Sequence, residues 1–237
     1  GRRRFLDMEI SQTSATYYHQ LMQYNRLLQQ RNAVLKEYRG KNTIPLEEWD
    51  LQLADMASFI VKKRLESLKK INLLIDLMNR KLTGGLENLT IGYEQPYMDI
   101  GSLEYTKEGF YERIKAALPQ DRHRLSTSVG PHRDDLRFFS DAMDLKKFGS
   151  QGQQRTAVLS LKLSELEFIK SEVGEYPVLL LDDVLSELDE SRRTNLLQFI
   201  HKRIQTFITT TDIHDFKDLK SVQFISCEGG QVQYGQP

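Results

Sequence analysis

The stretch Pro177-Val178-Leu179-Leu180-Leu181-Asp182-Asp183 places two adjacent carboxylates directly after a short apolar run. Such a run predicts a strand that is buried on both faces within a parallel sheet. Because ligands of open α/β sheets lie at the carboxyl ends of the strands, Asp182 and Asp183 are candidate site residues. One carboxylate is suited to hold the Mg²⁺ that accompanies nucleotide phosphates, and the other to orient or deprotonate an attacking water. The alternative is a solvated strand end followed by a helix cap.

The segments on either side of this strand alternate between helix and strand. Apolar side chains at helical spacing predict helices over residues 151–172 and 190–203, and a strand is predicted over residues 206–210. This order favours an α/β domain. Asp189 stands just before the second helix, where an aspartate is a common N-cap.

Residues 148–155, Phe-Gly-Ser-Gln-Gly-Gln-Gln-Arg, open the first of these helices with small side chains. Small residues at a helix start expose backbone N–H groups and the positive end of the helix dipole, which together bind anions. The hydroxyl of Ser150 adds a further donor. The alternative is an ordinary helix start at which Ser150 acts only as the N-cap.

The N-terminal third of the chain predicts two long helices. Residues 6–38 and 46–82 carry apolar side chains at helical spacing, and Gly84 and Gly85 follow as helix-ending residues. Two such helices joined by a short loop form an antiparallel hairpin, which projects from a globular body or packs on a partner. The other predicted elements are strands over residues 86–93, 125–130, 136–139 and 143–147, a helix over 107–117 that ends at Pro119, and a terminal hairpin of 221–226 and 231–234.

Composition places the chain among globular proteins. Its 237 residues carry 33 basic and 33 acidic side chains, which excludes a histone-like coat but allows a basic face. No run approaches ~18 consecutive apolar residues, so no membrane association is expected. Cys227 is the only cysteine, which excludes an internal disulfide or a cysteine zinc site and favours a cytoplasmic protein. The chain opens on Gly1 rather than methionine, so we expect a piece of a longer protein.

Two further features carry charge. Residues 130–135 are Gly-Pro-His-Arg-Asp-Asp, and their spacing does not suit a metal site on a strand. We interpret this motif as structural, with Arg133 forming a salt bridge to Asp134 or Asp135. Basic clusters at residues 2–4, 62–64 and 69–70 either neutralise DNA phosphates or are simply solvated faces.

Several of these segments together resemble the RecF family of bacterial recombination mediators. They are residues 148–167 (FGSQGQQRTAVLSLKLSELE), 177–193 (PVLLLDDVLSELDESRR), 130–135 (GPHRDD), 2–7 (RRRFLD) and 24–36 (YNRLLQQRNAVLK). The resemblance runs from end to end. It implies an ATPase of the ABC class, related to the structural-maintenance-of-chromosomes proteins.

The resemblance assigns roles to individual residues. Asp182 is implied to be the Mg²⁺ carboxylate of the Walker B strand, and Asp183 stands where related ATPases carry a catalytic glutamate. Because an aspartate is one methylene shorter, slow hydrolysis is expected. Thr211 takes the position of the switch histidine of many relatives, which puts that sensing role in doubt, and His214 lies too far along to replace it. The implied nucleotide contacts are Ser150, Gln151, Gly152 and Gln153 of the ABC signature and Asp189 of the D-loop.

The implied fold is α/β: the signature half of an ABC-type ATPase domain with an inserted antiparallel helical arm domain. The implied boundaries are a helical arm over residues 1–85, the remainder of the helical and strand subdomain with its connection over 86–140, and the C-terminal part of the ATPase domain over 141–237.

The P-loop pattern GxxxxGK[ST] is absent, since the only Gly-Lys pair, Gly40-Lys41, is followed by Asn42 between the predicted helices. RecF proteins carry the P-loop near the N-terminus, so the resemblance implies a C-terminal fragment. In a head-to-tail dimer, the signature of one subunit contacts the γ-phosphate on the other subunit's P-loop. We therefore expect a weak ATPase for the full-length protein and no measurable ATP binding by this chain alone.

The resemblance also implies cofactors and partners. These are ATP and Mg²⁺, an ATP-dependent homodimer, double-stranded and gapped or single-stranded DNA, and RecR together with RecO. The implied function is recombinase loading in gap repair, replication restart and the SOS response. The alternative hypothesis is a non-catalytic helical scaffold or dimerisation module. No DNA-contacting residue is assigned.

Overall fold

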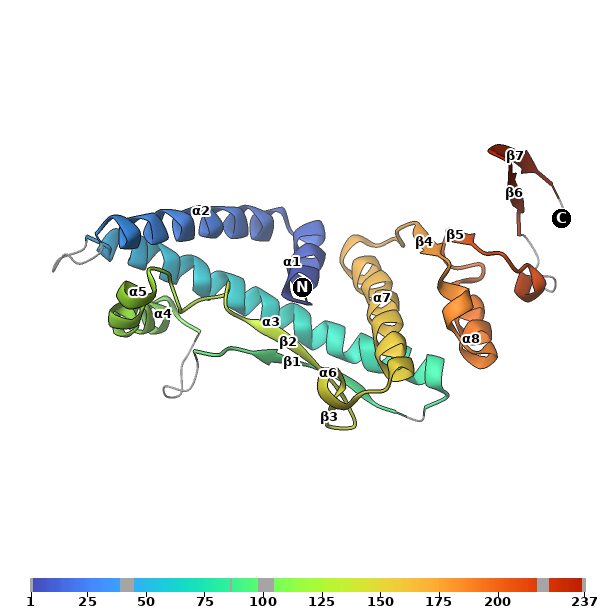
Figure 1. The fold of residues 1–237 in the computed structure, drawn as a ribbon, viewed down its shortest axis with the longest axis horizontal. Coiled ribbons are helices and arrows are strands. Elements are labelled where there is room, and N and C mark those ends of the chain that lie inside the picture. The colour runs from blue at the N-terminus through green and yellow to red at the C-terminus, as the bar shows by residue number, and fades with distance from the viewer. Residues whose placement is uncertain (1, 39–44, 86, 98–104, 217–221, 236–237) are drawn as a thin grey trace.

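Helix α3 (Glu47–Thr83) is the longest described element and packs against strand β1 and against most of the other α-helices (Figure 1). Its 37 residues span about 55 Å at 1.5 Å per residue. Acidic residues in its first turn and Arg80 and Lys81 in its last turn complement the helix dipole. Gly84 ends it in the left-handed conformation, with φ 69°. The computed structural model describes residues 2–38, 45–85, 87–97, 105–216 and 222–235.

Shorter helices surround α3. Along its N-terminal half lie α2 on one side and α4 and α5 on the other. Helix α1 lies near its middle, and α7 and α8 pack against its C-terminal half (Figure 1). Within the described parts of the chain, none of the helices has both the length and the apolar character needed to cross a bilayer. The helices are α1 (Arg2–Thr13), α2 (Ala15–Glu37), α4 (Lys107–Ala116), α5 (Leu118–Arg124), α6 (Leu145–Phe148), α7 (Gln151–Val173) and α8 (Glu190–Ile200).

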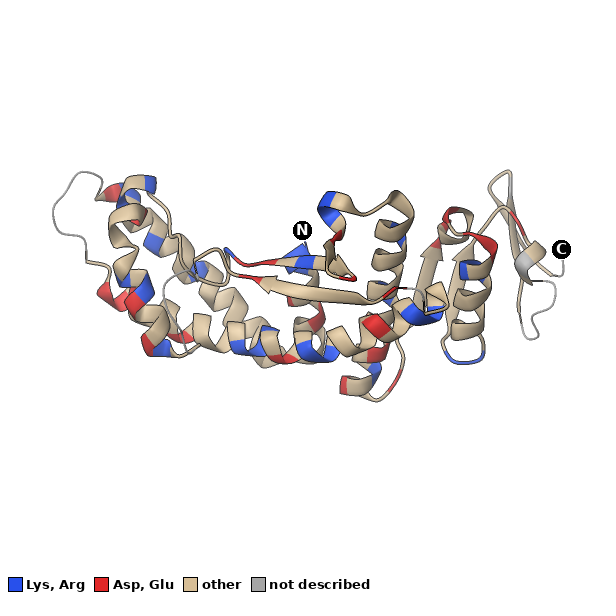
Figure 2. Cartoon of the chain, turned by 90° about the horizontal axis from the view of Figure 1, so that it is seen from below, with Lys and Arg blue, Asp and Glu red and all other residues tan. Residues whose placement is uncertain are grey.

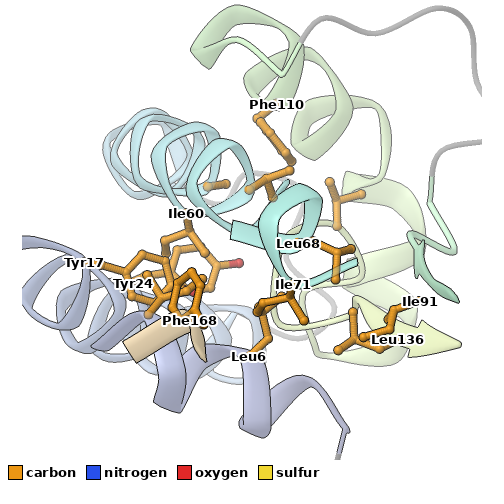
Figure 3. Close-up of a cluster of buried hydrophobic side chains, with 14 of the residues drawn as sticks. Leu6, Tyr17, Tyr24, Ile60, Leu68, Ile71, Ile91, Phe110, Leu136 and Phe168 are labelled. Atoms are coloured by element: carbon orange, nitrogen blue, oxygen red, sulfur yellow. The ribbon is translucent and has the colours of Figure 1, made fainter. Parts of the chain in front are cut away.

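Two hydrophobic clusters form the interior, and α3 contributes to both. In the first, Phe168 of α7 packs beside Leu6, Tyr17 and Tyr24, with Phe110 on another side of α3 (Figure 3). The second joins Met78 and Leu82, at the end of α3, to α7, α8 and the strand that precedes Asp183. Because one rigid helix enters both clusters, the arm and the C-terminal α/β part share their packing.

An antiparallel sheet packs on α3. Strand β1 (Leu89–Glu94) pairs with β2 (Asp135–Ser140), which pairs with the short β3 (Met143–Asp144). The other edge of β1 is bonded by α3: the Asn72 amide donates to Ile91 O at 2.9 Å and accepts from Ile91 N at 2.6 Å. One turn on, Asp76 accepts from Leu89 N at 3.2 Å. Side chains of a helix thus satisfy a strand edge that would otherwise remain unpaired.

A second sheet consists of β4 (Leu179–Asp182) and β5 (Thr206–Thr209), which are parallel. Helices cover one face, where Leu179 and Leu181 are buried, but Leu180 is 72% exposed and Phe207 53% exposed on the other. The prediction that this strand is buried on both faces is therefore wrong for the described chain, because nothing within it covers the second face. A hairpin of β6 (Ile225–Glu228) and β7 (Gln231–Tyr234) lies near the C-terminus.

Most predicted helices are confirmed, but the local boundaries differ. The helix predicted over residues 6–38 is two helices, because Ser14 adopts an extended conformation and caps α2 by accepting from Tyr17 N. Pro119 opens α5 instead of ending a helix, as suits a residue that lacks an N–H group. Residues 125–130 form no strand, since Leu125 and Gly130 both have positive φ, and most of the strand predicted over 143–147 is helix α6. Gly40, Lys41, Asn42, Leu86 and Ser221 lie outside the described residues.

A buried ion network fixes α1 and the loop at residues 130–135 to α3. The guanidinium of Arg64, 1% exposed, donates to both oxygens of Asp7 at 2.8 and 2.9 Å. It also donates to Asp134 at 3.2 Å and to the carbonyl of Pro131 at 2.7 Å. Arg64 is therefore not available to DNA phosphates, unlike the exposed Lys62 beside it.

The motif at residues 130–135 is structural, but through different partners from those predicted. Asp134 pairs with Arg64 and also accepts from the hydroxyl of Tyr97 at 2.6 Å, whereas Asp135 pairs with Arg2. Arg133 is exposed, and among the described residues the ion pairs of the two aspartates are formed with Arg64 and Arg2 instead.

His132 of this motif is held at both ring nitrogens. Nδ1 lies 2.7 Å from the hydroxyl of Tyr24, and Nε2 lies 3.0 Å from the carbonyl of Thr127. Since a carbonyl can only accept, Nε2 carries the proton and Nδ1 accepts from Tyr24. Burial lowers the pKa of His132 to about 4, so the ring is neutral. This geometry describes a structural histidine rather than a catalytic one.

Removing Arg64 tests the importance of the network. We expect Arg64→Ala to lower the free energy of unfolding by about 3–5 kcal/mol, because Asp7 and Asp134 are left without their buried cation. Lys63→Ala, which removes only an exposed pair with Glu66, is the control and is expected to cost less than about 1 kcal/mol. Denaturant unfolding measures both. Equal effects would contradict the role given to the network.

Glu9 predicts a pH dependence of stability. It is fully buried on α1, and its carboxyl group faces the carboxyl group of Glu165 and the amine of Lys162 on α7. Burial, with the neighbouring Glu165, raises the pKa of Glu9 from 4.5 to about 8. The stability that protonated Glu9 contributes is present below pH 4.5 and is lost as the pH rises through about 8.

We therefore expect Glu9→Gln to raise the Tm at pH 9 and to change it little at pH 5. Thermal unfolding at both values measures the difference. The exposed Glu112→Gln is the control and should show no such pH dependence. If Glu9→Gln had the same Tm as the unmodified chain at both pH values, the raised pKa of Glu9 would be contradicted.

Candidate functional site

The carboxyl end of β4 is held by the neighbouring strand. Parallel pairing sets Asp182 level with Thr209. The Thr209 hydroxyl donates to Oδ1 of Asp182 at 2.6 Å and accepts from the backbone N–H of Asp183 at 3.0 Å. Both carboxylates are exposed. Asp183 has φ 52° and ψ 21°, a left-handed conformation that is uncommon outside glycine and is often found at functional sites.

The segment after Asp183 returns to the interior and then opens α8. The short helix η1 (Val184–Glu187) buries Leu185, and Leu188 is also buried. Asp189 then caps α8, accepting from Arg192 N at 2.9 Å and pairing with the Arg192 guanidinium at 3.1 Å. Asp189 is therefore the N-cap of α8 and is exposed at the same time.

The start of α7 forms a capping box. Ser150 Oγ accepts from Gln153 N at 3.2 Å, and Gln153 Oε1 accepts from Ser150 N at 3.0 Å. The Gln153 amide also donates to Glu87 at 3.0 Å, so its polar atoms are engaged within the chain. Ser150, Gln151 and Gly152 are exposed, and the Ser150 hydroxyl retains its hydrogen for an external acceptor.

These two parts of the site lie side by side. Arg155 of α7 and Glu187 of η1 approach to 3.8 Å. A Cβ placed on Gly152 would lie 3.9 Å from the guanidinium of Arg192 in α8. The helix start at Ser150 and the segment that follows Asp182 and Asp183 thus belong to one exposed surface.

The donor set suits a metal that is shared with a ligand. Within the described ranges, no group of three or more His, Cys, Asp or Glu side chains could hold a metal ion by itself. Mg²⁺, however, is usually bound through one or two carboxylates together with substrate phosphates and water. Asp182 fits this use, because Thr209 bonds one oxygen and leaves the second for a hard cation.

The loop after β5 is closed by its own side chains. Thr210 Oγ1 donates to Asp212 O at 2.9 Å, and Asp212 accepts from His214 N at 2.9 Å. Thr211 is exposed at the turn, and His214 begins the short helix η2 (His214–Phe216). That Thr211 does not fill the sensing role of the switch histidine remains a prediction.

The sequence alone did not indicate Thr209 as a site residue. It also did not indicate that Arg155 lies near Glu187, or that Gly152 lies near Arg192. Three consecutive threonines follow Ile208, and only the strand register shows which one is level with Asp182. Local patterns carry no such information, because the register depends on how two strands separated by a helix are packed.

The sequence closely matches curated proteins named "DNA replication and repair protein RecF". That of Alkaliphilus oremlandii is 49% identical over 222 residues, which cover 92% of this chain and 60% of the relative. That of Halalkalibacterium halodurans is 44% identical over 239 residues, 98% of this chain and 64% of the relative. The chain is a homologue of RecF. It spans about three fifths of the length of these relatives, and no family model matches it.

Solved structures agree with this relationship. A structure of the recombination mediator protein RecF with ATP in the RecFOR pathway has a TM-score of 0.85 and 36% identity, covering 99% of this chain and 62% of that chain. An Smc head domain from Pyrococcus furiosus has a TM-score of 0.51 at 13% identity, and this similarity supports only a shared fold. The fold is thus the one predicted, the signature half of an ABC-type ATPase domain with a helical arm.

Two glycines at the start of α7 should respond oppositely to alanine. A Cβ on Gly149 would lie 2.6 Å from the carbonyl of Leu145, whereas Gly152 is open. We expect Gly149→Ala to lower the free energy of unfolding by about 1–3 kcal/mol through this clash. Gly152→Ala, the matched control, is expected to be neutral or to stabilise the helix by about 0.5–1 kcal/mol. Denaturant unfolding of both variants measures this, and a more harmful Gly152→Ala would contradict the geometry.

Proposed function

We propose that this chain supplies one half of a composite ATP site in a RecF-type dimer. The observation that carries the proposal is that the start of α7 contacts the segment that follows Asp182 and Asp183, through Arg155 and Glu187 and through Gly152 and Arg192. A site of this kind is open and polar, and it lacks a phosphate-cradling loop of its own. The other half of the site would be provided by the part of RecF that lies outside this chain and by a second subunit.

The start of α7 would contact the γ-phosphate bound to the partner subunit. Ser150 offers a hydroxyl hydrogen, and the first backbone N–H groups of α7 carry the positive end of a 23-residue helix. Gly152 has no side chain, so an oxyanion can approach the helix closely. Gln151 is exposed and adds a donor at the rim, whereas Gln153 stabilises the helix start through the capping box.

The end of β4 would face the phosphates of its own subunit. Asp182 would hold Mg²⁺ through the oxygen that Thr209 leaves open, and the bound ion would neutralise charge that develops on the phosphates. Asp183 is turned out of the strand by its left-handed backbone and would orient or deprotonate the attacking water. The short reach of this aspartate favours slow hydrolysis, so we propose a weak ATPase. Asp189, at the start of α8, would line the interface between subunits.

The open face of the β4–β5 sheet is consistent with a larger domain. Leu180 and Phe207 form an exposed apolar surface there, and the RecF relatives have further length that would cover it. We propose that the P-loop part packs on this face. It would complete the buried parallel sheet that the apolar run at residues 178–181 predicts.

In the cell, ATP binding would close two such proteins around DNA, and hydrolysis would open them. By the names of its relatives, the protein would act in DNA replication and repair. We further propose that it helps to load recombinase at gaps with RecO and RecR in the cytoplasm, and that it serves replication restart and the SOS response. Lysines and arginines are interspersed with acidic residues along the chain (Figure 2). Because the 33 basic residues are balanced by 33 acidic ones, we expect no reading of base sequence, and contacts with duplex or single-stranded DNA would be made to backbone phosphates.

The test measures ATP-dependent dimerisation of a longer protein that contains this chain together with the part of RecF that lies outside it. We expect Asp182→Ala and Ser150→Arg each to abolish the ATP-induced increase in mass measured by light scattering. The first removes the metal carboxylate, and the second fills the phosphate-facing helix start. The exposed residues Asp55 and Gln12 provide the controls Asp55→Ala and Gln12→Arg, which should dimerise normally.

The isolated 237-residue chain should show no ATP binding by titration calorimetry. Tight binding by this chain alone would contradict the composite site. Dimerisation that persists in both Asp182→Ala and Ser150→Arg would instead favour the non-catalytic scaffold.

A further inference from the structure

We propose that Thr209 is a positioning residue that sets the geometry of both carboxylates at the end of β4. The inference rests on the proposed function, because it concerns the same metal and water site. One hydroxyl serves both residues: its hydrogen goes to Asp182 Oδ1 at 2.6 Å, and its lone pair receives the Asp183 N–H at 3.0 Å. No other described side chain bonds both residues.

The first bond orients the metal carboxylate. An exposed aspartate side chain rotates freely in water unless a partner holds it. The bond from Thr209 holds Oδ1 and leaves Oδ2 as the oxygen for a cation. Partners of this kind, which bond a ligand rather than the metal, commonly change metal affinity by about 10–100-fold when they are removed.

The second bond holds the backbone of Asp183. Its left-handed conformation, φ 52°, costs about 1–2 kcal/mol for a residue other than glycine. The N–H bond to Thr209 stabilises this turn at the point where the chain leaves the strand. It therefore determines where the Asp183 side chain stands relative to Asp182, which is the spacing that a metal and an attacking water require.

The neighbouring threonines do not serve this role. The hydroxyl of Thr206 donates to Ile204 O at 3.0 Å, and that of Thr210 donates to Asp212 O at 2.9 Å. Only Thr209 is level with Asp182 in the parallel register. Valine has the same shape and suits a strand equally well, so the hydroxyl can be removed without changing the backbone preference.

The test compares Thr209→Val, Thr209→Ser and the matched control Thr206→Val, which removes a hydroxyl from the same strand. The first readout is amide hydrogen exchange of Asp183 in this chain, measured by NMR without nucleotide. We expect faster exchange in Thr209→Val, normal exchange in Thr209→Ser and no change in Thr206→Val. An unchanged rate in Thr209→Val would overturn the proposal, whatever the nucleotide experiments show.

The second readout uses the protein that carries the remaining RecF length, at saturating ATP. We expect Thr209→Val to raise the Mg²⁺ concentration for half-maximal dimerisation by about tenfold or more, and Thr209→Ser to restore it. Faster exchange with an unchanged Mg²⁺ requirement would overturn the positioning role while leaving the proposed function intact. Dimerisation that is insensitive to Asp182→Ala would instead show that the proposed function has failed, and the inference with it.

Discussion

The buried guanidinium of Arg64 is the constraint on which the arm depends. Removing such a charge from water is costly, and the cost is offset only when every partner is in place. Asp7 comes from α1, Asp134 from the loop at residues 130–135, and Arg64 itself from the centre of α3. Three segments far apart in the sequence therefore have one acceptable arrangement, and the apolar residues around them pack within it.

This fixed arrangement extends to the candidate site through α3 and α7. Helix α3 enters both hydrophobic clusters, and α7 places Phe168 in the first cluster and Leu163 in the second. The start of α7, at Ser150, is therefore held at a set distance from the arm by close packing rather than by a flexible linker.

The site contrasts with the arm in how its polar groups are satisfied. In the arm, the side chains of Arg31 and Arg64 are buried, and each pairs with two aspartates. At the ends of β4 and at the start of α7, the carboxylates, the serine and the glycine are exposed, and Asp183 keeps a strained backbone. Polar groups that find their partners within the chain stabilise the fold, whereas these remain available to a ligand or a second subunit.

The features that depend on near neighbours could be predicted from the sequence: the long helices, the strand at residues 179–182, the paired carboxylates and the capped start of α7. The sequence did not determine the break at Ser14, the helix that opens at Pro119, the partners of Asp134 and Asp135, or the part that Thr209 plays beside Asp182. Those were decided by the tertiary structure. Helical periodicity and capping act over one or two turns, while ion pairs and strand register depend on which distant segments are packed together.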